Sequence, residues 1–134
     1  MPPQKPWTLE DADQLYNMQG WGLNYFGINA KGHVTVQPKK IPEGAIDVMD
    51  VIEDLTARGI KMPVLIRFQD ILRRRVALIN EAFGAAIKEY GYGGRYFGVY
   101  PIKVNQLREV VDEIGDAGRP FQFGLEAGSK GELL

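Results

Sequence analysis

The chain contains no cysteine and only one histidine, His33, among its 134 residues. Without cysteine it can form no disulfide bond, and it offers no thiolate as a nucleophile or metal ligand. Acidic and basic side chains nearly balance, so the formal net charge at pH 7 is −1. A charge this small gives no electrostatic reason to expect binding to nucleic acid or to an acidic membrane.

Long apolar runs are also missing. No stretch approaches the roughly 18 apolar residues that a membrane-spanning helix needs. Residues 1–7 (MPPQKPW) lack the apolar core of a secretion signal. The hydrophobic content of 45% and the charged content of 25% are ordinary for a globular protein. We therefore expect a cytoplasmic protein with the size of one domain.

Helical and strand-like patterns alternate with turn signals in residues 1–62. Thr8 is a suitable N-cap for a short helix, and Gly59 suits the left-handed position at which a helix ends. Residues 29–32 (NAKG) can form the turn of a hairpin. The predicted elements are a helix at 8–17, strands at 24–30 and 33–37, and a helix at 46–58.

From residue 63 onward, strands and helices alternate. The predicted strands are 64–67, 96–102 and 121–125, and the predicted helices are 70–90 and 106–116. Asp70 is a suitable cap for the long helix, and Ser129, three residues before Glu132, for a further one. This order favours parallel strands joined by right-handed crossovers, and hence an α/β fold. Five apolar residues on the long helix have helical spacing and should be buried: Leu72, Val76, Ile79, Phe83 and Ile87.

Lys103 directly follows the predicted strand 96–102. An amine at the carboxyl end of a parallel strand lies at the edge where α/β enzymes carry out their chemistry. Partial desolvation there would favour the neutral amine, the form that attacks carbonyl groups to make a Schiff base. On position alone, however, a lysine that closes a strand is more often a solvated cap.

Four segments resemble, in the same order, blocks of the biosynthetic arginine decarboxylases. They are residues 21–38 (WGLNYFGINAKGHVTVQP), 63–75 (PVLIRFQDILRRR), 96–106 (YFGVYPIKVNQ) and 123–133 (FGLEAGSKGEL). That group belongs to the larger family of barrel-type, alanine-racemase-like decarboxylases that depend on pyridoxal phosphate. The resemblance implies the N-terminal part of a (β/α)8 barrel of the TIM type in residues 63–134. Residues 1–62 would form a small helix and hairpin segment before it.

The resemblance also implies a chemistry. Lys103 would bind pyridoxal phosphate, and Glu126 and Ser129 would line the cofactor pocket. The reaction would convert L-arginine to agmatine and CO2 in polyamine and spermidine biosynthesis, in a homo-oligomer that also needs magnesium. Glu126 and Ser129 each have a structural alternative, as a solvated carboxylate at a strand end and as a helix N-cap.

Length limits this interpretation. A complete barrel takes about 250 residues, so we expect the N-terminal part of a longer enzyme. The remaining cofactor-binding groups come later in the family's chain, and the isolated polypeptide should be inactive. Two alternatives stay open: a decarboxylase or racemase of another amino acid on the same fold, and a truncated or inactive homologue that acts only as a binding partner. We expect His33 to be a surface or half-buried polar residue, and residues 73–75 (RRR) to form a solvated face.

Overall fold

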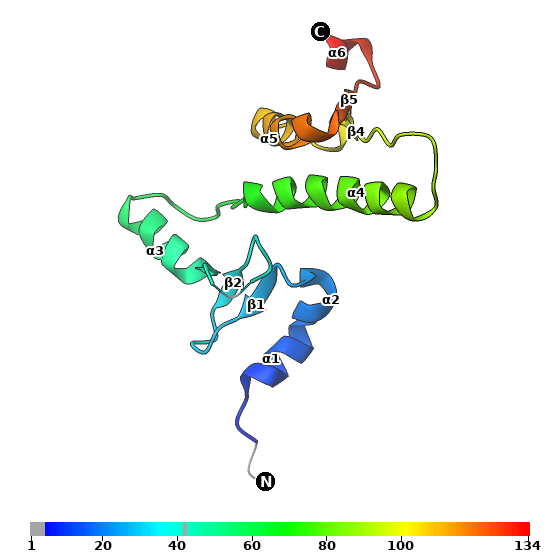
Figure 1. The fold of residues 1–134 in the computed structure, drawn as a ribbon. Helices are drawn as coiled ribbons and strands as arrows, with labels where there is room; N and C mark the ends of the chain where they lie inside the picture. Colours follow the sequence, from blue (N-terminus) through cyan, green and yellow to red (C-terminus); the bar gives the residue numbers. More distant parts are fainter. Residues whose placement is uncertain (1–4, 42) are drawn as a thin grey trace. The chain divides into compact units, whose positions relative to one another are not determined.

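The structure is a computed structural model that describes residues 5–41 and 43–134. The chain forms two compact units, one ending at Ile66 and the other beginning at Arg67 (Figure 1). The sequence analysis placed this division after residue 62. Within the described ranges, no helix is long and apolar enough to cross a membrane.

The first unit is a three-stranded antiparallel sheet with helices before and after it. Its elements are α1 (Leu9–Tyr16), α2 (Met18–Gly22), β1 (Phe26–Ile28), β2 (Val34–Val36), β3 (Ile46–Asp47) and α3 (Val48–Ala57). The strand order is β1–β2–β3, and Val36 of the central strand pairs with Phe26 on one side and Ile46 on the other. The predicted hairpin is therefore confirmed, although its strands are shorter and a third strand extends the sheet.

The core of the first unit is small and centres on β2. Val36 is fully buried, and Met18 and Tyr25 are nearly so. The predicted cap of α1 is confirmed, because the Thr8 hydroxyl accepts a hydrogen bond from the Asp11 N–H and the Asp11 carboxylate accepts one from the Thr8 N–H. These reciprocal bonds satisfy two of the N–H groups that a helix leaves unpaired at its start.

Asp47 explains why the helix predicted at 46–58 begins later than expected. Its backbone is extended, and its side chain accepts a hydrogen bond of 2.9 Å from the Met49 N–H, so it caps α3 and leaves Ile46–Asp47 to pair as a strand. The same carboxylate lies 2.9 Å from His33 Nδ1 and accepts a hydrogen bond of 2.8 Å from the Asn29 amide. Asp47 thus ties the hairpin turn to the start of α3.

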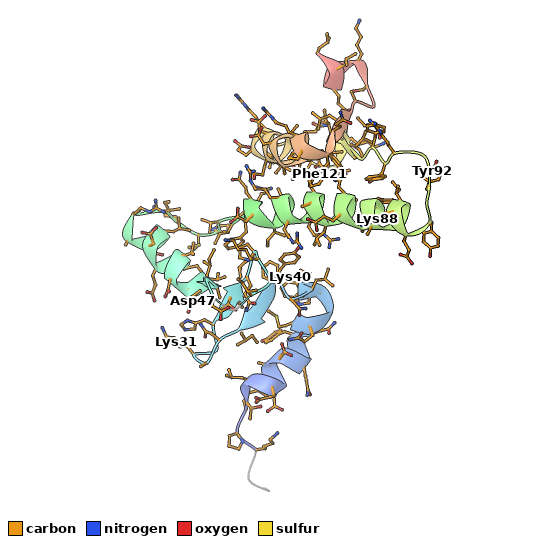
Figure 2. The ribbon with its side chains drawn as sticks, in the orientation of Figure 1. Lys31, Lys40, Asp47, Lys88, Tyr92 and Phe121 are labelled. Atoms are coloured by element: carbon orange, nitrogen blue, oxygen red, sulfur yellow. The ribbon has the colours of Figure 1, made fainter. Side chains whose placement is uncertain are left out.

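The second unit contains the predicted β/α alternation. Its elements are α4 (Gln69–Glu89), β4 (Val99–Pro101), the 3-10 turn η1 (Ile102–Val104), α5 (Arg108–Gly118), the 3-10 turn η2 (Arg119–Phe121), β5 (Gly124–Glu126) and α6 (Lys130–Leu133). Strands β4 and β5 pair in parallel, as predicted. Val76, Val110 and Ile114 form the buried cluster between α4 and α5, and Phe121, labelled in Figure 2, packs against it.

Three predicted strands are corrected by the structure. The strand predicted at 121–125 is shifted to Gly124–Glu126, because Arg119–Phe121 forms the turn η2. Residues 64–67 form no strand, because a strand is defined by a hydrogen-bonded neighbour and the described residues bring none to this segment. The strand predicted at 96–102 is limited to Val99–Pro101. Pro101 has no N–H to donate, so it is a natural last residue for the ladder.

The long helix α4 differs from its prediction in two respects, the residue at which it begins and the residues that it buries. It begins at Gln69 after Phe68, so Asp70 lies in the first turn and is not the cap. Val76 is buried as expected, but Ile79 is 39% exposed and Phe83 is 48% exposed. Phe83 instead stacks on Tyr96, with ring centroids 3.9 Å apart. Only the part of the apolar stripe that faces α5 and β4 is buried.

Val36→Ala should destabilise the first unit by about 2 kcal/mol, because it removes two buried methyl groups and leaves a cavity. The matched control is Val34→Ala in the same strand, where the side chain is 40% exposed and the cost should be below about 1 kcal/mol. Urea unfolding followed by tryptophan fluorescence measures this unit specifically, since both tryptophans, Trp7 and Trp21, belong to it. Equal losses in the two variants would contradict the assigned core.

Stability of the first unit should also fall in acid. Burial disfavours the charged form of Asp47, but hydrogen bonds from His33, the Met49 N–H and Asn29 outweigh it, so the pKa of Asp47 lies below its usual value of 3.8. A lowered pKa stabilises the fold above pH 3.8, and this contribution disappears as the pH falls through the lower folded value. The unfolding midpoint should therefore drop as the pH falls below about 4, and less so in Asp47→Asn. The exposed Asp50 provides the control Asp50→Asn; a pH dependence unchanged by Asp47→Asn would refute the assignment.

Candidate active site

The carboxyl edge of the parallel pair β4–β5 carries the candidate site. The register places Val99 beside Gly124, Tyr100 beside Leu125 and Pro101 beside Glu126. Parallel strands end at the same edge of a sheet, which is where ligands bind in α/β folds. Glu126 is the last residue of β5, and Lys103 follows the last residue of β4 by two positions.

Lys103 was expected at the tip of the strand. In the structure it lies in the 3-10 turn Ile102–Val104 that follows the strand. The strand ends at Pro101, and the chain tightens immediately into this turn. The amine is therefore presented just beyond the sheet edge. Its position relative to β5 depends on the turn as well as on the strand.

The Lys103 amine faces the Glu126 carboxylate. Lys103 Nζ and Glu126 Oε1 are 3.9 Å apart, and the two side chains are 65% and 46% exposed. A pair this exposed contributes little to stability. It does keep a primary amine beside an acidic group, both within reach of a ligand at the sheet edge. Two of the three predicted site residues are thus brought together.

Ser129, the third predicted residue, acts in the structure as a helix cap. Its hydroxyl accepts a hydrogen bond of 3.3 Å from the Glu132 N–H at the start of α6. The Glu132 carboxylate accepts a hydrogen bond of 2.6 Å from the Gly128 N–H, so the loop after β5 is closed from both sides. The structural alternative for Ser129 therefore has direct support.

A contact on the other side of Lys103 was missed by the sequence analysis. The Tyr100 hydroxyl donates a hydrogen bond of 3.2 Å to the backbone carbonyl of Asn105. The Asn105 side chain in turn accepts one of 3.1 Å from the Leu107 N–H, directly before α5. The signal for the second bond was present in the sequence, since Asn often bonds the N–H two residues ahead at a helix start. The first bond depends on tertiary folding.

Ion pairs fix the scaffold behind this edge. Arg73 of α4 pairs with Glu113 of α5, whose side chain is only 12% exposed. Arg74 pairs with Glu81 at 3.3 Å along α4. The basic run at residues 73–75 was expected to form a solvated face, yet one of its members joins two helices. This pair helps to hold α5, and with it the end of the loop that carries Lys103.

Neither His33 nor a metal site contributes to this edge in the described residues. His33 is half-buried in the first unit, as expected, and pairs with Asp47. Within the described part of the chain, no group of three or more His, Cys, Asp or Glu side chains could hold a metal ion.

The chain is similar in sequence to several curated proteins. No family model matches the chain. Proteins named biosynthetic arginine decarboxylase from Gloeobacter violaceus and Thermosynechococcus vestitus are 56% and 52% identical to it, each over 96% of its length. The protein of the same name from Phocaeicola vulgatus is 49% identical over 96% of the chain.

The chain is thus similar in sequence to a segment of proteins named biosynthetic arginine decarboxylase. It spans about 20% of the length of these curated relatives and corresponds to their N-terminal part. The crystal structure of the biosynthetic arginine decarboxylase from Campylobacter jejuni superposes with a TM-score of 0.77 at 36% identity, covering 88% of this chain and 19% of that one. The mixed α/β fold of the segment is therefore shared with a solved decarboxylase.

Substitution of two glutamates should distinguish a residue that stabilises the fold, Glu113, from a residue of the candidate site, Glu126. Glu113→Ala should lower the unfolding free energy of the second unit by about 1–3 kcal/mol, because it leaves Arg73 without its nearly buried partner. Glu126→Ala should change it by less than about 0.5 kcal/mol, because the Lys103–Glu126 pair is exposed. Urea unfolding followed by helical circular dichroism measures both. A larger loss for Glu126→Ala than for Glu113→Ala would contradict this division.

Proposed function

We propose that this chain is the N-terminal part of a decarboxylase that converts L-arginine to agmatine and CO2 with pyridoxal phosphate, for polyamine and spermidine biosynthesis. The observation that carries the proposal is Lys103 at the carboxyl edge of β4–β5, in a segment homologous to proteins named arginine decarboxylase. In keeping with the lack of a membrane-spanning helix in the described residues, we place its action in the cytoplasm.

The residues at the edge fit part of what pyridoxal phosphate requires. The cofactor presents an aldehyde, and a primary amine such as Lys103 is the side chain that joins an aldehyde through a C=N bond. When bound, pyridoxal phosphate acts as an electron sink for the carbanion left by the departing carboxylate. The Lys103 side chain is 65% exposed, so its amine can reach a cofactor seated outside the edge.

Glu126 is the second functional side chain in this proposal. Its carboxylate lies 3.9 Å from the Lys103 amine, so a small movement of either side chain would allow the two groups to exchange a proton. Ser129 is proposed to act indirectly, by capping α6 and shaping the loop beside the cofactor. Both assignments place the chemistry on the ends of strands, which the packed helices keep rigid.

Other features of the complete enzyme are part of the same proposal. We infer that the β4–β5 pair is the beginning of a (β/α)8 barrel, that the enzyme is a homo-oligomer and that magnesium acts outside this segment. The parallel pairing with helices α4 and α5 packed against it supports the barrel, whereas the homo-oligomer and the magnesium rest on the family resemblance alone. Residues that recognise the guanidinium group are not assigned here, so another amino acid on the same fold is the alternative for substrate.

A chimeric enzyme tests the lysine assignment. In it, these 134 residues replace the matching N-terminal part of the Gloeobacter violaceus protein, to which they are 56% identical. Borohydride reduction in the presence of pyridoxal phosphate should label the peptide that contains Lys103. Lys103→Ala should lower arginine turnover by about a thousandfold or more.

The matched control for Lys103 is Lys130→Ala, which removes another exposed lysine near the same edge. It should keep both labelling and turnover. A pyridoxyl adduct on a different peptide, or unchanged turnover in Lys103→Ala, would disprove the assignment. Labelling at Lys103 with no release of CO2 from arginine would instead favour a different substrate or an inactive homologue.

The isolated 134-residue chain should release no CO2 from arginine, because the described residues supply the amine but no complete cofactor pocket. The measurement is 14CO2 release from carboxyl-labelled arginine, with the chimeric enzyme as the positive control. Turnover by the isolated chain would contradict the view that most of the pocket lies outside this segment.

A further inference from the structure

The turn that carries Lys103 needs an anchor that the Glu126 pair does not provide. The Lys103 side chain is 65% exposed, and its amine pairs at 3.9 Å with the Glu126 carboxylate, whose side chain is itself 46% exposed. Exposed pairs of this kind are weak and mobile. The direction in which the amine points must therefore be set by the backbone of the turn Ile102–Val104.

Tyr100 is the fixed point on the strand side of that turn. Its backbone pairs with Leu125 in the parallel ladder. Its half-buried ring packs against the cluster of Val76, Val110 and Ile114 between α4 and α5. The ring is thus held by both the sheet and the helices, and its position does not depend on the turn.

The Tyr100 hydroxyl extends from this fixed ring across the turn. It donates a hydrogen bond of 3.2 Å to the Asn105 carbonyl, which lies one residue beyond η1. Asn105 is fastened on its other side by the bond of 3.1 Å between its side chain and the Leu107 N–H. Residues 100–105 therefore form a closed loop, with Lys103 inside it and both ends tied to packed elements.

We propose that Tyr100 is a positioning residue for Lys103, a role that rests on the proposed function. A phenylalanine would fill the space between the strand and the helices equally well, so packing alone does not account for the hydroxyl. The role of the hydroxyl is the hydrogen bond to the Asn105 carbonyl, which closes the loop. It restrains the turn without touching the amine, and leaves Lys103 free to react.

Tyr100→Phe in the chimeric enzyme isolates the hydroxyl from the ring. Amide hydrogen exchange in the peptide that spans residues 101–107 should become faster by about three- to tenfold, as expected for the loss of one hydrogen bond. The kcat for arginine should fall by a similar factor of about three to ten, while KM and the melting temperature stay close to wild type. Tyr100→Leu, which also removes the ring, should in addition lower the melting temperature.

The control is Tyr90→Phe, which removes the hydroxyl of a tyrosine that is 80% exposed at the end of α4. It should leave exchange, kcat and melting temperature unchanged. Unchanged exchange at residues 101–107 in Tyr100→Phe would overturn the closed loop. Faster exchange with wild-type kcat would overturn the positioning role. A wild-type chimera without an adduct on Lys103 would overturn the proposed function and with it the role of Tyr100, whereas the exchange measurement would still decide whether the loop is closed.

Discussion

Three residue pairs join β4 to β5, and their register determines whether a site exists at all. Pro101 stands beside Glu126, so the chain that leaves β4 passes the carboxylate that ends β5. Successive side chains in a strand point to opposite faces, and a slip of one residue would turn Glu126 away from Lys103. The register is held from behind, where Tyr100 and Phe123 pack against the buried cluster shared by α4 and α5. The placement of Lys103 beside Glu126 thus depends on the packing of side chains on the helix-facing side of the strands.

Local sequence signals predicted which helices and strands form better than they predicted the residues at which these elements begin and end. The Thr8 cap, the hairpin and the parallel pairing were all predictable, since each depends on a few residues or on the order of elements. The end of β4 was placed too late because apolar character continues through Ile102, whereas the ladder stops at the proline. The segment 64–67 has the composition of a strand, but composition does not supply a partner. For the site, the family resemblance indicated Lys103 and Glu126, since position alone favoured solvated strand ends for both, and the sequence gave no sign of the Tyr100 contact.

Two ion pairs of the second unit differ in how exposed their side chains are. The less exposed pair contributes to stability, and the more exposed pair lies at the candidate site. Glu113 is 12% exposed and pairs with Arg73 across two helices, where loss of one partner leaves an uncompensated charge. Glu126 and Lys103 are far more exposed, so their pair costs little to form or to break. Under the proposed function, the Lys103 amine must be released from its partner in order to bond to the cofactor, and an exposed, weak pair allows this. A strong, buried partner would hold the amine in place but would also keep it from reacting.

The contacts proposed to position Lys103 join residues that are close together along the chain. Tyr100 and Asn105 are five residues apart, and the strand partner Glu126 is 23 residues from Lys103. Contacts between residues close in sequence form at small cost in chain entropy, so this amine can be positioned by its own neighbourhood. The relatives are about five times as long as this chain, which spans 20% of their length. Under the proposed function, this segment would orient the Lys103 amine, and the remaining length of the enzyme would supply the pocket around the cofactor.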